Sequence, residues 1–349
     1  MLTDICQVIQ RNLDHFESTR NGLVLDCMDE HIIDVLPESF TAFTTSRSVY
    51  QKAQSGGRMT FGVLPEVDAK PDTVLVIMPK SKPELRFQLA WIRANVQPGG
   101  NVYLVGAKKE GIASGAKLLD ELGGQPTKID VARHCQLWQV EALDPVDSFY
   151  PGDWETTWSF SLPGAGDIKV CSLPGVFSHS SLDKGTACLL ETLEPFFDDL
   201  VKRRKPLKGE WLDFACGAGV IAAYLLKRFP ELTVTCVDNS AVAIHCAKRT
   251  FEMNGLSARF IVSDGLAEVS GRYHGIVTNP PFHSGVKTDY SVTESFIADI
   301  SLHLKRKGQL FMVANSFLRY PQMIREVFPA YKRLAADNRF AVHYAQMSG

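Results

Sequence analysis

The chain has 349 residues, of which 45% are hydrophobic and 22% are charged, and its formal net charge is −2. This length suits two domains, and the charge argues against a generic polyanion-binding protein. The sequence has no apolar run of about 18 residues and no signal-peptide pattern, so we expect a cytoplasmic protein with reduced cysteines. It has no CxxC pair and no HxxxH or HExxH spacing, so we expect no metal site.

The first half of the chain contains three segments that predict strands but no glycine-rich loop. Each segment has a counterpart in the second half at a similar spacing, which predicts an internal duplication. Met78 stands in the first half where Asn279 stands in the second, so we expect the first copy to have lost its chemistry. The matched segments are Thr73–Lys80 with Gly275–Pro281, Gly100–Gly106 with Gly308–Ala314, and Arg133–Val140 with Arg339–Gln346.

Glycine and proline become frequent between residues 145 and 167, which is typical of an inter-domain connection. We therefore predict a first domain over residues 1–165 and a second over residues 166–349. The first carries 15 Lys and Arg against 21 Asp and Glu, a net charge of −6, and the second carries 22 against 18, a net charge of +4. The basic excess lies in the second domain, with clusters at 202–208 and 305–307 that are otherwise typical of solvated linkers or helix ends.

The second domain alternates short apolar runs with amphipathic stretches, which predicts a parallel, doubly wound α/β sheet. In such a sheet, ligands bind at the carboxyl ends of the strands. We expect strands over Glu210–Phe214, Thr233–Val237, Arg259–Val262, Gly275–Thr278, Gln309–Ala314, Tyr331–Leu334 and Arg339–Gln346, and helices over Gly219–Arg228, Ala241–Asn254 and Thr293–Leu304.

The first strand of the second domain runs into a glycine-rich turn. In the segment Asp213-Phe-Ala-Cys-Gly217-Ala-Gly219, which opens a helix, glycines let the backbone approach a ligand closely. The usual dinucleotide pattern has a third glycine, which is missing here. An acidic residue before the loop, Asp213, suits a cofactor with an ammonium group better than one with a pyrophosphate, which favours S-adenosylmethionine over NAD.

Acidic residues also end the next two strands. Asp238 is placed to accept hydrogen bonds from both ribose hydroxyls of the cofactor, and Asp264 to accept from the adenine amino group. The alternative interpretation for each aspartate is a helix N-cap, where this residue type is favoured. Three acids in register at one edge of the sheet favour the cofactor site.

The most specific motif is Asn279-Pro280-Pro281-Phe282, at the end of the fourth strand. The Asn279 side-chain oxygen and the Pro280 carbonyl are suited to accept both hydrogens of a planar amino group, which turns the nitrogen lone pair toward a methyl donor. Phe282 is placed to stack on the base that carries this amino group. We expect Asn279→Asp, which keeps an acceptor oxygen, to retain more activity than Asn279→Ala.

These motifs resemble the amino-methylating class I methyltransferases. The segment Leu173–Thr186 is similar to the lead-in of the ribosomal RNA guanine-N2 methyltransferases, and Pro79–Leu89 is similar to the N-terminal domain of the small-subunit member of that family. The resemblance covers nearly the whole chain. It implies two class I (Rossmann-like) methyltransferase domains by duplication, the N-terminal one degenerate and used for RNA guidance or as a scaffold. It also implies S-adenosylmethionine-dependent methylation of the exocyclic N2 amino group of a guanine in 16S rRNA, with the small ribosomal subunit as partner.

The same resemblance implies the site residues. Ala215 departs from the glycine that many methyltransferases carry, so we expect a slightly tighter loop. The cofactor positions are Asp213, Ala215, Gly217, Gly219, Asp238, Asp264 and Asn279, with Gly185 and Thr186 flanking the methionine end, and the catalytic positions are Asn279, Pro280 and Phe282. No sequence feature determines the oligomeric state, for which we expect a monomer.

Three other functions remain open. An adenine-N6 nucleic-acid methyltransferase uses the same Asn-Pro-Pro-aromatic arrangement. A protein-glutamine methyltransferase also uses this arrangement, although the motif of that family is Asn-Pro-Pro-Tyr and this chain has Phe282 in the last position. A non-catalytic RNA-binding assembly factor is compatible with the first half of the chain.

Overall fold

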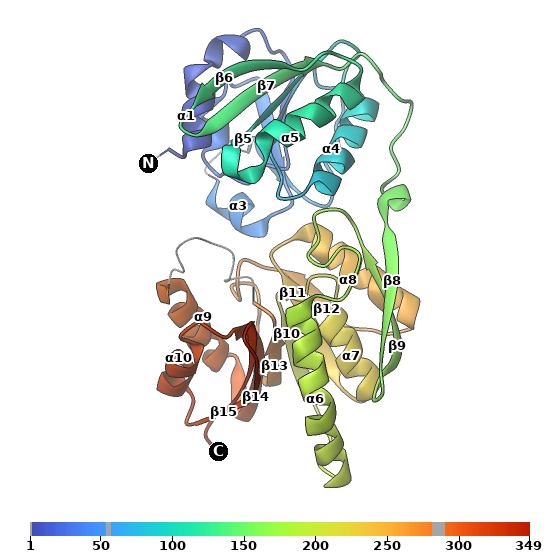
Figure 1. Cartoon of the computed structure of the whole chain (residues 1–349), viewed down its shortest axis with the longest axis vertical. Helices are drawn as coiled ribbons and strands as arrows, with labels where there is room; N and C mark the ends of the chain where they lie inside the picture. The colour runs from blue at the N-terminus through green and yellow to red at the C-terminus, as the bar shows by residue number, and fades with distance from the viewer. Residues whose placement is uncertain (1, 54–56, 281–289) are drawn as a thin grey trace. The chain divides into compact units, whose positions relative to one another are not determined.

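The computed structural model describes residues 2–53, 57–280 and 290–349 and divides the chain into two compact units, Met1–Glu155 and Thr156–Gly349 (Figure 1). The second unit starts before the position expected from the sequence because a β-hairpin precedes its sheet. The hairpin strands are β8 (Thr156–Leu162) and β9 (Gly166–Ser172), and β9 packs against α7 (Val220–Arg228) and α8 (Ala241–Asn254) of the second unit. Part of the glycine- and proline-rich segment is therefore the turn of this hairpin.

Both units contain a seven-stranded sheet with the same strand order. The order is β3-β2-β1-β4-β5-β7-β6 in the first unit and β12-β11-β10-β13-β14-β16-β15 in the second. In each sheet the first five strands are parallel and the last two pair antiparallel. The segments matched in the sequence are β4 with β13, β5 with β14 and β7 with β16. The predicted duplication and the fold class are confirmed, because one complex strand order occurs twice.

In the first unit, helices cover both faces of the sheet. Apolar residues of α1 and α2 pack on one face, and residues of α4 and η3 pack on the other. The strands are β1 (Gly22–Leu25), β2 (Phe40–Thr44), β3 (Met59–Phe61), β4 (Thr73–Ile77), β5 (Asn101–Ala107), β6 (Thr127–Ala132) and β7 (Cys135–Glu141). The helices are α1 (Asp4–Arg11), η1 (Leu13–His15), α2 (Ile32–Val35), α3 (Arg47–Lys52), α4 (Lys82–Asn95), η2 (Lys108–Glu110), α5 (Ile112–Gly115), η3 (Ala116–Leu122) and η4 (Pro151–Trp154).

After the hairpin, the second unit follows the elements expected from its sequence, with three main differences. Helix α6 and helix α10 were not predicted, and the predicted helix over Thr293–Leu304 ends earlier because Leu304 pairs with Tyr273 and begins a strand. The strands are β10 (Glu210–Phe214), β11 (Thr233–Asp238), β12 (Arg259–Val262), β13 (Tyr273–Thr278), β14 (Leu304–Asn315), β15 (Ala330–Ala336) and β16 (Phe340–Gln346). The helices are α6 (Lys184–Lys202), α7 (Val220–Arg228), α8 (Ala241–Asn254), α9 (Tyr290–Leu302) and α10 (Tyr320–Val327).

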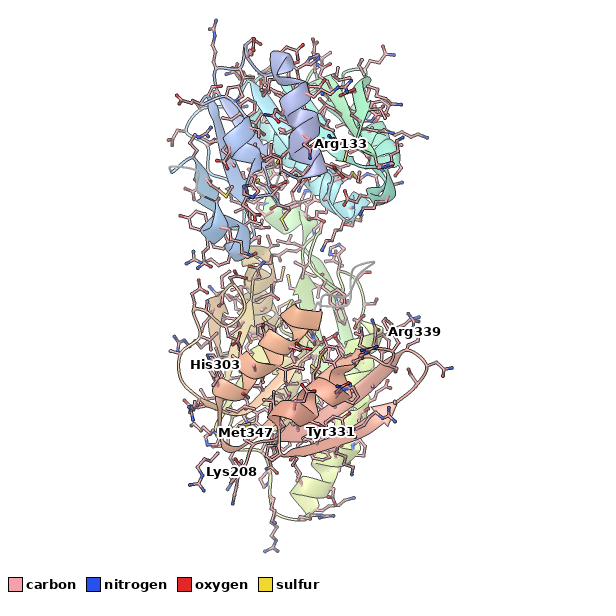
Figure 2. The ribbon with its side chains drawn as sticks, turned by 90° about the vertical axis from the view of Figure 1, so that its left-hand side faces the viewer. Arg133, Lys208, His303, Tyr331, Arg339 and Met347 are labelled. Carbon is pink, nitrogen blue, oxygen red and sulfur yellow. The ribbon has the colours of Figure 1, made fainter. Side chains whose placement is uncertain are left out.

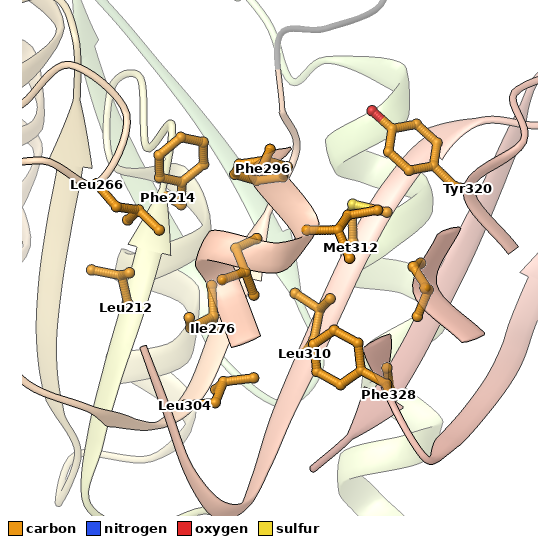
Figure 3. Packing of buried hydrophobic residues seen from close by; sticks show 14 of the residues in the cluster. Leu212, Phe214, Leu266, Ile276, Phe296, Leu304, Leu310, Met312, Tyr320 and Phe328 are labelled. Atoms are coloured by element: carbon orange, nitrogen blue, oxygen red, sulfur yellow. The ribbon is translucent and has the colours of Figure 1, made fainter. Parts of the chain in front are cut away.

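The central strands of the second unit are buried on both faces. Leu310 and Met312 of β14 point toward α9 and α10, where they join the cluster that includes Phe296 (Figure 3). The residue between them, Phe311, packs against Phe197 of α6 with ring centroids 5.7 Å apart. This alternation along one strand explains why the strands read as continuous apolar runs in the sequence.

A buried ion pair ties the hairpin to two helices of the second unit. Glu194 of α6 is 9% exposed, and its Oε1 accepts hydrogen bonds from Arg228 Nη1 at 2.6 Å and from the Tyr224 hydroxyl at 2.7 Å. Its other oxygen accepts from the Gly164 backbone N–H at 2.7 Å, in the turn of the hairpin. A Cβ at Gly164 would lie 1.4 Å from Arg228 Nη1, so glycine is required at this turn.

Among the residues that the structure describes, no helix has both the length and the apolar character needed to cross a bilayer. In the same part of the chain, no three His, Cys, Asp or Glu side chains gather closely enough to hold a metal ion.

Candidate functional site

The predicted site residues follow one another along the carboxyl edge of the second sheet. The strands run in the order β12-β11-β10-β13, so Asp264, Asp238, the loop 215–219 and Asn279 lie at successive strand ends. Neighbouring strands are about 4.8 Å apart. Strands β11 and β12 lie on one side of β10, and β13 lies on the other. Doubly wound sheets bind ligands at the carboxyl ends of the strands where the strand order changes direction in this way.

The loop after β10 has a left-handed backbone at three residues. The φ angles are 56° at Ala215, 53° at Gly217 and 79° at Gly219. A Cβ at Gly219 would lie 3.1 Å from the Cβ of Ala247, whereas a Cβ at Gly217 would meet nothing within 4 Å. The loop therefore packs closely against α8 at one end and faces open space at Gly217. At Ala215 the same conformation costs roughly 1–2 kcal/mol relative to a right-handed one.

Asp213 lies beneath this loop and is fully buried. Its Oδ2 accepts a hydrogen bond from the Ala222 backbone N–H at 2.9 Å, and it thereby caps α7, whose N-cap residue Gly219 has no side chain. Its Oδ1 has no hydrogen-bond partner in the described part of the chain. Burial, with a smaller contribution from the nearby Asp238, raises the pKa of this carboxyl to about 8 against the opposing hydrogen bond from Ala222. A buried acceptor without a partner is rare in native proteins, so a donor from a ligand would satisfy it.

Asp238 holds the glycine-rich loop in place. Its Oδ2 accepts from the Gly217 backbone N–H at 2.9 Å, and its Oδ1 accepts from the Ser240 backbone N–H at 2.9 Å. The N-cap of α8 is Ser240, whose hydroxyl accepts from the Ala243 N–H at 3.2 Å, so the helix-cap interpretation of Asp238 is wrong. Burial raises the pKa of Asp238, although its backbone donors oppose this shift. Each carboxylate oxygen accepts two hydrogen bonds, which leaves capacity for a diol.

Asp264 ends β12 in a turn that two other residues close. The Ser263 hydroxyl donates to Glu268 Oε2 at 2.6 Å, and the same oxygen accepts from the Asp264 backbone N–H at 3.1 Å. The next element in the chain is β13, so Asp264 does not cap a helix. Asp264 is half-buried and follows β12, whose last residue Val262 pairs with Asp238 at the end of β11.

Asn279 is held by the beginning of α6. Its side-chain Nδ2 donates to Asp183 Oδ2 at 3.1 Å and to the Thr186 hydroxyl at 3.0 Å. Asp183 is also the N-cap of α6, and its Oδ2 accepts from the Thr186 backbone N–H at 2.9 Å. Since both amide hydrogens are used in this way, the orientation of the amide is fixed. The carbonyl oxygen of Asn279 is the group left to accept a hydrogen bond from a ligand.

Gly185 lets α6 approach this closely. A Cβ there would lie 3.0 Å from Asp183 Oδ2, 3.2 Å from the ring of Phe340 and 3.4 Å from Asn279 Nδ2. The structure thus brings Gly185 and Thr186 to Asn279. Pro280 is buried, and Pro281 and Phe282 lie outside the described residues.

Comparisons with known proteins bear on both units. Residues 167–344 match the family Methyltransferase small domain, and residues 6–158 match Methyltransferase small domain N-terminal. Proteins named Ribosomal RNA small subunit methyltransferase C from Pseudoalteromonas atlantica and Aeromonas hydrophila are 37% and 35% identical to this chain, over 98% and 99% of it and 99% of each of them. The chain belongs to the ribosomal RNA small subunit methyltransferase C family. The resemblance drawn from the sequence is therefore confirmed.

One solved structure is similar in fold to this chain over both of its units. It is the T. thermophilus 16S rRNA N2 methyltransferase RsmC in complex with AdoMet and guanosine, with a TM-score of 0.82 and 22% identity over 99% of this chain and 92% of that one.

Asp183 lies within the segment Leu173–Thr186, and the sequence alone assigned it no role. The signal was an aspartate directly before Lys184, three residues before Thr186, which is the spacing of a helix N-cap and its N3 residue. The cap was therefore visible in the sequence. Its second contact, to Asn279, joins residues 96 positions apart and depends on the tertiary fold.

Asp238→Ala is expected to weaken cofactor binding at least tenfold. The change removes the acceptor of the Gly217 N–H and the proposed acceptor of the ribose hydroxyls, and a hydrogen bond to a charged group contributes about 1.5–3 kcal/mol. Calorimetric titration with S-adenosylmethionine measures the effect.

The matched control is Ser240→Ala, which removes the cap of α8 and costs about 1 kcal/mol of stability without touching the ligand. If both variants bound the cofactor as the wild type does, the assignment of Asp238 to the ribose would fail.

Proposed function

We propose that this chain transfers a methyl group from S-adenosylmethionine to the exocyclic N2 amino group of a guanine in 16S rRNA of the small ribosomal subunit. The observation that carries the proposal is the fixed amide of Asn279 at the carboxyl edge of the sheet, whose Nδ2 is committed to Asp183 and Thr186. Membership of the family and the AdoMet and guanosine bound by the T. thermophilus relative support it.

The residues at this edge fit the cofactor. The unpartnered Oδ1 of Asp213 supplies a buried acceptor, and Gly217 leaves open space above the loop. Asp238 and Asp264 at the next strand ends suit the ribose hydroxyls and the adenine amino group, and Gly185 and Thr186 suit the methionine end. When bound, S-adenosylmethionine supplies an electrophilic methyl group on a sulfonium.

The protein's part in the reaction is to position the amino group. The Asn279 carbonyl oxygen and the Pro280 carbonyl accept its two hydrogens, so the nitrogen lone pair turns out of the plane of the base. Fixed acceptors of this kind stabilise the positive charge that develops on the nitrogen during attack and need no reorganisation. The nitrogen loses its extra proton after the bond has formed, so a strong base is not required. Phe282 would stack on the base.

Mapping of methylated nucleosides in 16S rRNA from cells that lack this protein tests the proposed function. One N2-methylguanine should be missing and should return when the wild-type gene is supplied. Loss of an N6-methyladenine would show that the chain is an adenine-N6 methyltransferase. Unchanged rRNA together with a missing methyl group on a protein glutamine would show that it is a protein-glutamine methyltransferase.

We also propose that the first unit does not catalyse and that it guides RNA or supports the second unit, in a cytoplasmic enzyme that acts as a monomer. Met78 follows β4 where Asn279 follows β13, and Thr44 ends β2 where Asp238 ends β11. Neither side chain offers a carboxylate or an amide. Met78 is also buried, and its Sδ would lie 2.5 Å from a Cβ on Gly115, so it fills space beside its strand end.

The basic residues of the first unit that suit RNA lie at the ends of two neighbouring strands. Lys80 and Lys82 follow β4, and Lys108 and Lys109 follow β5, and all four are exposed. Changing all four to Glu should weaken binding to 16S rRNA by about tenfold or more and leave the cofactor affinity unchanged, because only phosphate contacts are lost. RNA affinity and methylation that both stay at wild-type values would favour the scaffold role.

A further inference from the structure

The two basic clusters noted in the sequence meet at the edge of the second sheet opposite to Asn279. Helix α6 starts beside Asn279 and runs to Lys202, and its last turns extend past the strands (Figure 1). Lys208 lies two residues before β10, and residues 305–308 bulge from the beginning of β14 between the pairs Tyr273↔Leu304 and Gly275↔Gln309. Only β13 separates β10 from β14, so these segments are about 10 Å apart.

An ion pair across this edge confirms that the two segments are neighbours. Lys305 Nζ lies 2.5 Å from Oε2 of Glu210, the first residue of β10. Trp211 Nε1 donates to the Lys208 backbone carbonyl at 3.2 Å, which fixes the chain just before that strand. Figure 2 shows Lys208 at the end of the second unit that lies well away from Arg339, which precedes Phe340 at the edge that carries Asn279.

Six exposed cations of this edge form what we call the distal surface. None of them makes an ion pair with any residue that the structure describes. They are Lys202, Arg204, Lys205, Lys208, Arg306 and Lys307.

Local effects explain only part of this surface. The helix dipole favours cations at the end of α6, which accounts for residues 202–205. Lys208, Arg306 and Lys307 belong to no helix. Like charges at this density repel one another, so their convergence from two distant segments destabilises the free protein unless a partner uses it.

The acids of this edge do not neutralise the distal surface. Glu210 is bound to Lys305, and Asp199 is bound to Arg203 at 2.9 Å. Two more acids, Glu231 before β11 and Asp299 in the last turn of α9, flank the edge and are outnumbered by the six cations. The net charge of +4 in the second domain is thus concentrated away from the catalytic edge.

We propose that the distal surface binds the phosphate backbone of the rRNA substrate at nucleotides remote from the target guanine. The choice of RNA as partner rests on the proposed function. The regular part of β14 runs six residue steps from Gln309 to Asn315, which corresponds to about 20 Å, so this surface reaches different nucleotides from those at Asn279. Backbone contacts of this kind set the position and orientation of a protein on RNA without reading its sequence.

The test compares two triple variants of the full-length chain that have the same net charge. The distal variant is Lys208→Gln, Arg306→Gln and Lys307→Gln. The control variant is Lys169→Gln, Lys248→Gln and Arg259→Gln, which removes three exposed cations from β9, α8 and β12 of the same unit. Affinity for naked 16S rRNA is measured from 50 to 300 mM salt, with calorimetric S-adenosylmethionine binding and thermal unfolding as fold controls.

The distal variant should bind naked 16S rRNA at least tenfold more weakly at 0.15 M salt. The slope of log affinity against log salt should fall in magnitude by about two, because each phosphate contact contributes roughly 0.7–0.9 to that slope. The control variant should change affinity by less than threefold. Equal losses in the two variants, or no loss in either, would overturn the proposal.

A loss of affinity for the assembled small subunit with none for naked rRNA would also overturn it, since the partner would then be a protein of the particle. None of these binding measurements depends on methyl transfer. Failure of the proposed function appears separately, as absence of rRNA methylation by the wild type.

Discussion

Asn279→Ala is expected to lower the rate of methyl transfer by about a hundredfold or more, because it removes a fixed acceptor of the target amino group. Thermal stability should change little, since the side chain contacts Asp183 and Thr186 rather than the core. Single-turnover kinetics with saturating cofactor measure the effect. A near wild-type rate, or a methyl group on a ring nitrogen of guanine, would contradict the proposed role.

The structure changes the expectation for Asn279→Asp. From the sequence, this variant keeps an acceptor and should be more active than Asn279→Ala. In the fold, the new carboxylate would stand in place of Nδ2, 3.1 Å from Asp183 Oδ2. Two like charges at such a distance repel by roughly 5 kcal/mol at an effective dielectric constant near 20, which exceeds the benefit of one acceptor. We therefore expect Asn279→Asp to be as slow as Asn279→Ala at neutral pH.

A second change should rescue this variant. Asp183→Asn combined with Asn279→Asp removes the repulsion and reverses the donor and the acceptor of the same hydrogen bond. Turning the new amide toward position 279 weakens the cap of α6, which costs about 1 kcal/mol and is smaller than the repulsion removed. The double variant should be at least tenfold faster than Asn279→Asp alone.

Two controls separate this contact from a general effect at α6. Asp183→Asn alone keeps an oxygen for both donors and should be only mildly slower. Asn279→Asp should also recover as the pH falls, because one proton shared by two adjacent carboxyls removes the repulsion. Wild-type activity of Asn279→Asp at neutral pH with Asp183 intact would show that Asp183 does not hold residue 279.

Glu194→Ala is expected to destabilise the second unit by about 3–5 kcal/mol, because it removes the buried one of the two acids that pair with Arg228 and leaves only Asp198, which is more than half exposed. Arg228 is 5% exposed, and the Tyr224 hydroxyl and the Gly164 N–H lose the same acceptor. For a unit of this size the melting temperature should fall by roughly 6–20 °C. Scanning calorimetry of the full chain measures the shift. The transition that belongs to the second unit is identified by its response to the cofactor.

The matched control is Asp199→Ala, five residues along the same helix. Asp199 pairs with Arg203 at the surface, where both side chains are more than half exposed, and such pairs contribute about 0–1 kcal/mol. Similar shifts for the two variants would show that the buried pair does not hold the hairpin to the helices.

The sequence by itself determined the fold class and placed the candidate site residues at one edge of the second sheet. Apolar runs and glycine turns gave β10, α8 and β12 with their observed ends, because each element buries a face whose period is local. The similarity of Thr73–Lys80 to Gly275–Pro281 revealed the duplication, since corresponding strands of the two copies follow one another at similar distances along the sequence. Asp213, Asp238, Asp264 and Asn279 were found because strand ends in a parallel sheet converge on one edge.

Only the tertiary structure decided which partners these residues meet. The linker composition of its turn predicts a connection in place of the hairpin β8–β9, whose attachment depends on Glu194, 30 residues away from Gly164. Asp183 was visible as a helix cap, but its contact with Asn279 requires α6 to pack against the carboxyl end of β13. The two basic clusters meet for the same reason: segments about 100 residues apart become neighbours through strand order, which no local pattern of the sequence encodes.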